Sequence, residues 1–340
     1  MSLDPPFIPE MAEPGFLAPV PDDVAERVTQ NVVAGAGRGD VGRRAGVRPV
    51  LGQHAAALVP QVRGAGRGAG PGGRPGDVGP DHDRGPGPGQ VPRGPGHQAE
   101  SLTVWINALV ASAGGTIIEN PEAPADEVTL GLESPAGEAA ATIIGTIGKE
   151  NLGGPALPTE DEGASLSIFQ GDMGSFMVNW PFVWSATKAG VEDGTFDQAL
   201  LDDIGWALYP QVTEDQQTAP PYGGINLGIG AYSNHVDLAY EAAECIVTPE
   251  HQAQYFATNG NPPSNTEAYD DPAVTEAFPM ADVIRESLEL AVPRPQTPYY
   301  NEVSTGLQQT WHPPSAVTPE VTPTKSSDLI TAVLRGEQLL

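Results

Sequence analysis

One segment, residues 37–99, limits what this chain can fold into more than any other feature. It is built almost entirely from Gly, Arg, Pro, Ala, Val, Asp, Gln and His. It lacks Phe, Tyr, Trp, Ile, Met, Lys, Asn, Ser, Thr and Glu, all of which occur elsewhere in the 340-residue chain. Such a composition buries too little apolar surface to offset the entropy of ordering the backbone. We therefore expect this segment to be disordered and to form no core.

Two explanations of the segment stay open. When permitted codons for residues 48–66 are read one nucleotide later, one reading is VPFWANTQLLWYRKSVAQA, which has the aromatic residues and alternation of a strand. Readings at the same offset exist for residues 78–81 and 90–97, and ordinary composition resumes at Glu100. These observations favour a compensated frameshift. The alternative is a genuine Gly/Arg/Pro-rich linker that binds RNA in the manner of an RGG segment.

The charge of the chain is strongly acidic, with 16 Lys and Arg against 44 Asp and Glu and a formal net charge of −28. Nine of the 16 basic residues are arginines of the 37–99 segment, which leaves seven for the rest of the chain. An acidic surface repels phosphate backbones, so we expect no nucleic-acid binding by the folded part. The single cysteine, Cys245, excludes an intrachain disulfide, and its helical context predicts a small core residue.

Hydrophobic periodicity outside the segment predicts alternating helices and strands, and therefore an α/β architecture. No apolar run is long enough to span a membrane. The predicted helices begin at Asp22 or cover 101–113, 135–147, 197–203, 236–246, 249–257 and 327–334. The predicted strands are 116–118, 174–180, 204–209 and the end of the Gly-rich stretch 222–230.

Catalytic signatures are poor. Outside the 37–99 segment the histidines are His235, His251 and His312, and no two of them share a metal-ligand spacing. Residues 185–188 match a serine–lysine acylase pattern without its accompanying motifs, and residues 145–150 form only part of a phosphate loop. Spacing along a sequence does not reveal a glycosidase carboxylate pair, so a glycoside-active enzyme stays open as an alternative. We expect no cofactor and no metal.

Two other stretches indicate ligand binding. Residues 177–184, MVNWPFVW, end an apolar strand at a proline, where a sheet edge commonly opens into a cleft. Aromatic faces stack on the C–H faces of sugar rings, which makes Asn179 and Trp180 candidate contacts. In the stretch 222–226, YGGIN, the glycines allow close backbone approach and Tyr222 offers a ring. An ordinary interdomain crossing is the alternative explanation of this second stretch.

These stretches resemble the sugar-binding lipoproteins of bacterial ABC importers, the extracellular solute-binding family 1 that includes maltose- and trehalose-binding proteins. The resemblance covers nearly all of residues 100–340. It is carried by GDMGSFMVNWPFVW (171–184), YGGINLGIGAYS (222–233), DLAYEAAECIVTPEHQAQY (237–255), NPPSNTEAYDDP (261–272) and PRPQTPYYNEVS (293–304). In addition, PPFIPEMAEPGFLAPVP (5–21) resembles the family's N-lobe, and the shifted reading VPFWANTQLLWYRK resembles its first hinge strand.

The resemblance implies an α/β chain with the two-lobe, type II periplasmic-binding-protein fold and an incomplete N-lobe. Residues 1–36 would be a remnant of the N-lobe and 37–99 the damaged segment. Residues 100–218 would form the C-lobe, 219–272 would return through the N-lobe, and 273–340 would be helices that pack mainly on the C-lobe.

The resemblance also implies a binding protein rather than an enzyme. A neutral sugar such as a disaccharide would be held between the lobes, and the closed protein would deliver it to the permease subunits of an ABC importer. Positions carried over for stacking on the sugar are Trp180, Tyr300 and, as a further candidate, Trp105. Positions carried over for polar or close backbone contacts are Asn179, Tyr222, Gly223, Gly224, Asn226 and Arg294, the last pairing with hydroxyls or a carboxylate.

Against the family pattern, we expect three parts to be missing from this copy: the signal peptide, the lipid-anchoring Cys and the first N-lobe strands. The family implies an extracellular monomer tied to the membrane only through that lipid anchor. Because the damaged segment falls across the hinge, we expect this truncated copy to fold poorly and to bind sugar weakly or not at all.

Overall fold

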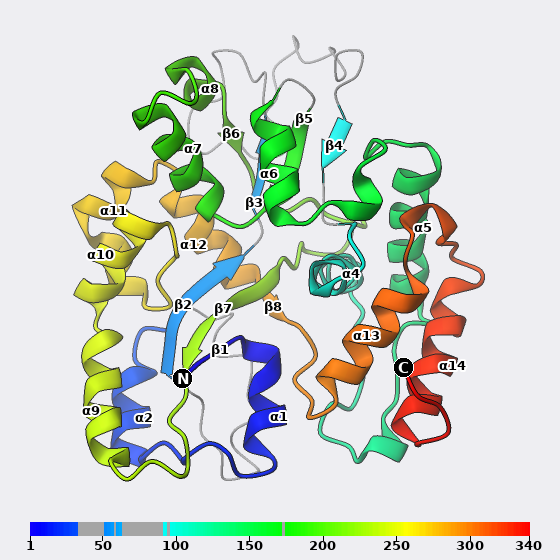
Figure 1. The fold of residues 1–340 in the computed structure, drawn as a ribbon, viewed down its shortest axis with the longest axis horizontal. Coiled ribbons are helices and arrows are strands. Elements are labelled where there is room, and N and C mark those ends of the chain that lie inside the picture. Colours follow the sequence, from blue (N-terminus) through cyan, green and yellow to red (C-terminus); the bar gives the residue numbers. More distant parts are fainter. Residues whose placement is uncertain (33–50, 58, 63–90, 94–95, 172–173) are drawn as a thin grey trace.

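The computed structural model in Figure 1 describes most of the chain. Within residues 51–62 and 91–93 it describes the backbone alone. The described ranges are 1–32, 51–57, 59–62, 91–93, 96–171 and 174–340.

The first of two sheets is built around β7 (Pro221–Leu227). Strand β2 (Leu51–Ala57) pairs with it in antiparallel fashion along most of its length. Strand β1 (Ser2–Leu3) pairs with the last residues of β7, also antiparallel, and β8 (Val292–Pro293) pairs in parallel with its first residues. β7 therefore receives chain segments from three distant parts of the sequence.

Helices cover this sheet and complete what we call the first lobe, in the lower left of Figure 1. One core joins Val24 to Tyr240 and Val247, and a second surrounds Phe256 and Ile284. The helices are α1 (Ile8–Ala12), α2 (Asp22–Val28), α9 (Val236–Ile246), α10 (Pro249–Asn259), α11 (Pro272–Ala277) and α12 (Ala281–Leu290).

The second sheet has the strand order β4-β5-β3-β6, with β4–β5 parallel and the other pairs antiparallel. Its strands are β3 (Val59–Val62), β4 (Val91–Arg93), β5 (Gly174–Asn179) and β6 (Gly205–Trp206).

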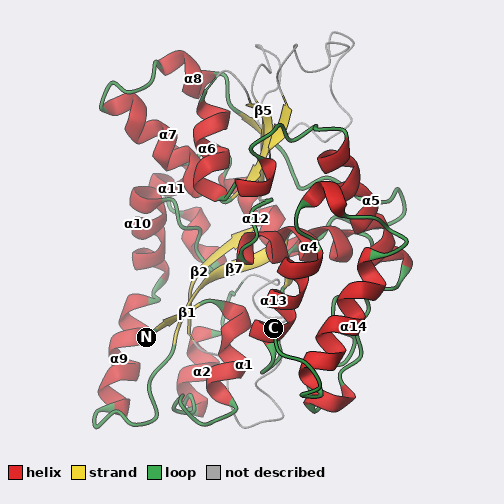
Figure 2. Ribbon diagram, turned by 45° about the vertical axis from the view of Figure 1, so that its right-hand side comes forward, coloured by secondary structure: helices red, strands yellow, loops and turns green. Residues whose placement is uncertain are grey.

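This sheet and the helices described below form the second lobe, in which α4, α5, α13 and α14 lie together (Figure 2). The largest core of this lobe lies among these four helices, around the fully buried Trp311. The helices are α4 (Glu100–Ser112), α5 (Pro135–Lys149), α6 (Glu162–Gln170), α7 (Phe182–Glu192), α8 (Gln198–Asp202), α13 (Tyr300–Thr310) and α14 (Thr322–Leu334).

Local sequence accounts for where several helices begin and end. α5 starts at a proline and has Lys149 in its last turn, opposite the partial negative charge of the helix C-terminus. The side chain of Thr248 caps the start of α10 by accepting a hydrogen bond from the amide of His251. α10 ends at Gly260, whose φ of +78° is a left-handed conformation that glycine adopts without a Cβ penalty.

The chain crosses between the lobes at three places within the described residues. It passes from β2 to β3, returns from β6 to β7, and leaves the first lobe again from β8 to α13. The stretch 273–340 therefore divides, because α12 packs with Phe256 in the first lobe and only α13 and α14 pack with α4 and α5. The expected C-lobe helices thus begin at Tyr300.

The expectation of disorder across residues 37–99 is corrected at three places. Residues 51–57, 59–62 and 91–93 are strands, because their backbone N–H and C=O groups pair with β7 and β5 whatever the side chains are. The crossing from β2 to β3 lies where the resemblance puts the family's first hinge strand. Residues 37–50, 58, 63–90 and 94–95 lie outside the described residues, and so do the predictions made for them.

Three local predictions also change. Residues 116–118 make only an isolated bridge between Ile118 and Leu130, and of 204–209 only Gly205–Trp206 pair as a strand. Cys245 is exposed instead of buried. In α9 the buried side is set by Tyr240 and Ala243, so a residue two positions after Ala243 faces away from the core.

A candidate ligand site at the junction of the lobes

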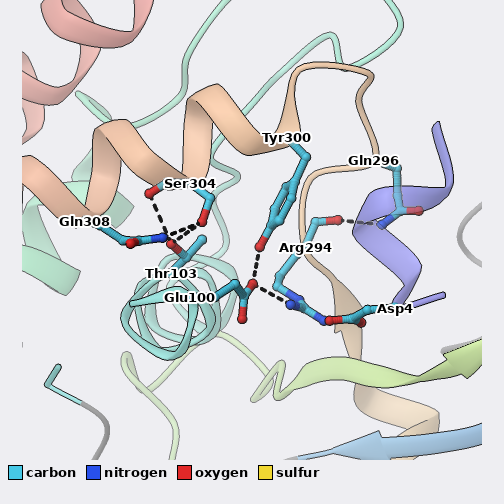
Figure 3. A network of polar contacts seen from close by, with 8 residues as sticks. All are labelled: Asp4, Glu100, Thr103, Arg294, Gln296, Tyr300, Ser304 and Gln308. Carbon is cyan, nitrogen blue, oxygen red and sulfur yellow. Dashed lines mark hydrogen bonds and ion pairs between the residues drawn. The ribbon is translucent and has the colours of Figure 1, made fainter. Parts of the chain in front are cut away.

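A polar network lies where the two lobes meet, centred on Arg294 (Figure 3). Arg294 directly follows β8, and its side chain is only 2% exposed. Its Nη2 donates to Oδ1 of Asp4 at 2.6 Å, and its Nη1 donates to Oε1 of Glu100. One guanidinium therefore binds a carboxylate from each lobe, since Asp4 follows β1 and Glu100 begins α4.

Tyr300 completes the network from the first turn of α13. Its hydroxyl donates to the same Oε1 of Glu100, and its ring meets the edge of Phe7 with centroids 5.2 Å apart and planes at 88°. Phe7 belongs to the first lobe, so this aromatic contact also joins the lobes. Tyr300 is fully buried, and its face is covered by protein in this structure.

The charges of the network are mutually dependent. Burial raises the pKa of Glu100, while the neighbouring Arg294 and the Tyr300 hydroxyl oppose that rise. For Arg294, burial favours loss of the proton, but the two carboxylates outweigh it and raise its pKa. Arg294 therefore stays charged, and its charge is balanced inside the protein.

A second part of the site lies on the neighbouring strand β7. The Trp180 indole, half-buried at the end of β5, lies against Gly223, where an added Cβ would come within 2.8 Å of the ring. Tyr222 is buried and faces Pro293 in the register of β7 and β8. Burial and, less strongly, the charge of Asp4 raise the pKa of the Tyr222 hydroxyl.

Of the nine predicted contact residues, the structure brings Trp180, Tyr222, Gly223, Arg294 and Tyr300 to the junction. Trp105, on α4, is 6% exposed and belongs to the core around Trp311.

The remaining three predicted residues serve the protein's own main chain: Asn179 bonds main-chain groups, and Gly224 and Asn226 lie within strand β7. Asn179 is buried, its Nδ2 donates to the carbonyl of Glu162 at 2.9 Å, and its Oδ1 accepts from the amide of Trp180 at 2.8 Å. Its amide group therefore orients the turn after β5. Gly224 has a φ of +137° and pairs with Ala55, while Asn226 is buried further along β7.

Two residues of the network, Asp4 and Glu100, were not predicted. Each resembles an ordinary helix-start acidic residue in sequence, Asp4 before Pro5 and Glu100 in the first turn of α4. The available signal was Arg294 itself, one of seven basic residues outside residues 37–99, in the apolar and Pro-rich string AVPRP. An arginine buried in such a context requires carboxylate partners.

Within the described ranges, no group of three or more His, Cys, Asp and Glu side chains is placed to hold a metal ion. The same part of the chain contains no helix with the length and apolar character needed to cross a bilayer.

Two α/β lobes joined by crossing strands, with aromatic and polar side chains gathered where they meet, define the two-lobe periplasmic-binding-protein fold. The chain belongs to the bacterial extracellular solute-binding protein family, whose model matches residues 98–281.

Solved structures support the fold at low sequence identity. The maltose-bound MalE3 protein of T. maritima is 20% identical with a TM-score of 0.76, over 99% of this chain and 84% of that one. A ribitol complex of an ABC transporter solute-binding protein from Agrobacterium radiobacter K84 is 16% identical with a TM-score of 0.75, over 98% and 84%. The GacH receptor of Streptomyces glaucescens, solved with acarbose, is 16% identical with a TM-score of 0.72, over 99% and 84%.

Proposed function

We propose that this chain is the extracellular solute-binding subunit of an ABC importer, that it holds a neutral oligosaccharide such as a disaccharide between its lobes, and that it delivers this sugar to a permease. The observation that carries the proposal is the Trp180 ring at the lobe junction, against Gly223 on the crossing strand β7. An indole face in this position suits the apolar C–H face of a sugar ring. The maltose, ribitol and acarbose bound by the structural relatives are consistent with this chemistry.

The Arg294 network favours a neutral solute over an acidic one. The Arg294 charge is already matched by Asp4 and Glu100, so a sugar carboxylate or phosphate would meet two fixed negative charges. The Nε of Arg294 is buried and has no hydrogen-bond acceptor among the described residues. A sugar hydroxyl that reached it would satisfy a donor that is otherwise costly to bury.

The proposed function involves binding and lobe closure without a chemical step. In the family a lipid anchor holds the protein at the external face of the membrane, whereas this copy would act as a monomer without the anchoring Cys. We expect the affinity of this copy to be weak. Tyr300, Tyr222 and Arg294 are buried against protein groups, and a sugar would have to displace those contacts to use them.

Titration calorimetry of the purified chain with maltose tests the proposal. We expect a dissociation constant weaker than micromolar, and Trp180→Ala should weaken binding by about tenfold or more, equivalent to about 1.4 kcal/mol. Phe176→Ala is the matched control, because Phe176 lies on β5, the strand that Trp180 directly follows, is 43% exposed and is not among the residues that meet at the junction. It should leave the affinity unchanged.

Absence of heat with maltose, trehalose and ribitol at millimolar concentrations would overturn the proposal that this copy still binds a neutral sugar. Binding at micromolar concentration or tighter would support the assignment and contradict the expected weakness. A chromogenic glycoside assay separates the enzyme alternative, because a binding protein should give no turnover.

A further inference from the structure

The position of Arg294 allows its ion pairs to influence the distance between the two lobes. Arg294 directly follows β8 of the first sheet, at the start of the segment that leads from the first lobe to α13 in the second. Its two carboxylate partners are 290 and 194 positions away in sequence, Asp4 in the first lobe and Glu100 in the second. The Arg294–Asp4 pair is held within the first lobe, because β1 and β8 both pair with β7, whereas the Arg294–Glu100 pair depends on how the lobes sit relative to one another.

The chemistry of the three groups makes the arrangement sensitive to lobe position. A guanidinium is a planar fork that stays protonated in proteins, and here Nη1 serves one carboxylate and Nη2 the other. If the lobes separate at this point, Arg294 must leave one of its partners. Because Arg294 is 2% exposed, water does not readily replace the lost partner.

We propose that Asp4 and Glu100 hold Arg294 as an ionic strut between the lobes, and that this strut sets the interlobe distance of the ligand-free protein. The strut does not depend on which solute binds, and it needs no solute to act. Its two acidic residues are positioning residues, because they act through Arg294.

The chain offers a matched control for the strut. Arg27, on α2, also bridges two carboxylates, Asp23 at 3.0 Å and Glu244 at 2.6 Å. All three of these residues belong to α2 and α9, within the first lobe. The Arg27 bridge therefore pairs the same kinds of groups without spanning the junction, at a more exposed position, where Arg27 is 52% exposed.

Pulsed electron paramagnetic resonance between two spin labels tests the proposal. Cys245 is the only cysteine of the chain and is exposed on α9 of the first lobe, so it carries one label. Lys325→Cys, at an exposed position on α14 of the second lobe, carries the other. The distance distribution between them reports lobe spacing without any ligand.

In this labelled parent we expect Asp4→Asn and Glu100→Gln to broaden the distribution and to shift it by several ångströms. Asp23→Asn should leave it unchanged. Tyr300→Phe should also leave it unchanged, because it removes one hydroxyl and keeps both ion pairs and the ring contact with Phe7.

Distributions that are the same in the parent, Asp4→Asn and Glu100→Gln would overturn the strut. An equal shift in Tyr300→Phe would also overturn it, because the Tyr300 hydroxyl bond to Glu100 rather than the ion pairs would then set the distance. If Glu100→Gln does not fold, as judged by circular dichroism, Asp4→Asn carries the test without touching the second lobe. Loss of folding in both, with Asp23→Asn folded, would show that the bridge serves folding instead of spacing.

Discussion

Replacing Arg294 by methionine should destabilise the folded chain measurably. The substitution keeps an unbranched apolar stem and removes two charge-assisted hydrogen bonds, to Asp4 and Glu100. Each such bond contributes about 1.5–3 kcal/mol when it is well buried. The Asp4 and Glu100 side chains are 37% and 35% exposed, so water recovers part of this, and we take about half. The expected loss of unfolding free energy is about 2 kcal/mol.

Glu100→Gln alone should change the unfolding free energy less, by about 1 kcal/mol, because the glutamine oxygen still accepts a hydrogen bond from Arg294 and Asp4 still balances its charge. The double variant carries both Arg294→Met and Glu100→Gln. It therefore lacks the Glu100 carboxylate that Arg294→Met alone leaves without its partner. We therefore expect the double variant to recover about 1 kcal/mol relative to Arg294→Met.

Urea unfolding of the parent, the two single variants and the double variant measures this double-mutant cycle. With a slope of about 3 kcal/mol per molar urea, a loss of 2 kcal/mol moves the midpoint by roughly 0.7 M. The reasoning is refuted if Arg294→Met moves the midpoint by less than about 0.2 M. It is also refuted if the two substitutions are additive within about 0.3 kcal/mol, because Arg294 and Glu100 would then not be coupled.

The cycle should also depend on pH. Burial raises the pKa of Glu100, so the folded state favours the protonated carboxyl. Its contribution to stability is then complete below the unfolded pKa of about 4.3 and is lost as pH rises through the folded value. Between these two values the parent should lose stability with rising pH relative to Glu100→Gln. An identical pH dependence of the two proteins would contradict this assignment.

Three further predictions concern other parts of the chain. Gly148→Ala should lower the stability measured by thermal unfolding by about 1–3 kcal/mol, because the added Cβ would lie 2.5 Å from the backbone carbonyl carbon of Pro314. Gly163→Ala is the control: its Cβ has room, so this substitution should be neutral or stabilising. Asp161→Ala should lower the unfolding free energy by about 1 kcal/mol, because the Asp161 Oδ1 caps α6 by accepting a hydrogen bond from the amide of residue 164. Asp197→Ala, at an N-cap without a side-chain bond, should lower it little. Equal effects of the two substitutions would contradict the capping argument. Burial raises the pKa of five tyrosines, so their contribution to stability is present below pH about 10 and is lost above it. Absorbance at the tyrosinate band should show these tyrosines ionising together with unfolding. Their ionisation in a chain that stays folded would refute the prediction. These tyrosines are Tyr209, Tyr222, Tyr240, Tyr269 and Tyr300.

The sequence predicted the elements whose signals are local. The apolar stripe from Leu102 to Val110 predicted α4, and the proline-started pattern at 135–147 predicted α5, each to within two residues. The prediction of strands failed where hydrogen-bond pairing with a distant strand, rather than the local side-chain pattern, decides the structure. Residues 51–57 carry no strand-like side-chain pattern, yet their backbone pairs with β7. A backbone ladder needs only a neighbouring strand at the right distance, and the composition of one segment does not show whether such a strand exists.

The candidate site divides in the same way. The sequence proposed Trp180, Tyr222 and Gly223 from local signatures, an aromatic residue at a strand end and a glycine in a crossing strand, and all three lie at the junction, while their contact with a ligand stays a prediction. Their mutual contact, the internal bonding of Asn179 and the burial of Trp105 could not be predicted.

By itself, the sequence determined the α/β class, helices such as α4 and α5, the acidic character and the motifs that carry the family resemblance, since each depends on neighbouring residues. The tertiary structure alone decided that Arg294 lies between Asp4 and Glu100. A buried charge takes whichever opposite charge the fold brings within hydrogen-bond distance, and that choice is made by the meeting of two lobes rather than by spacing along the chain.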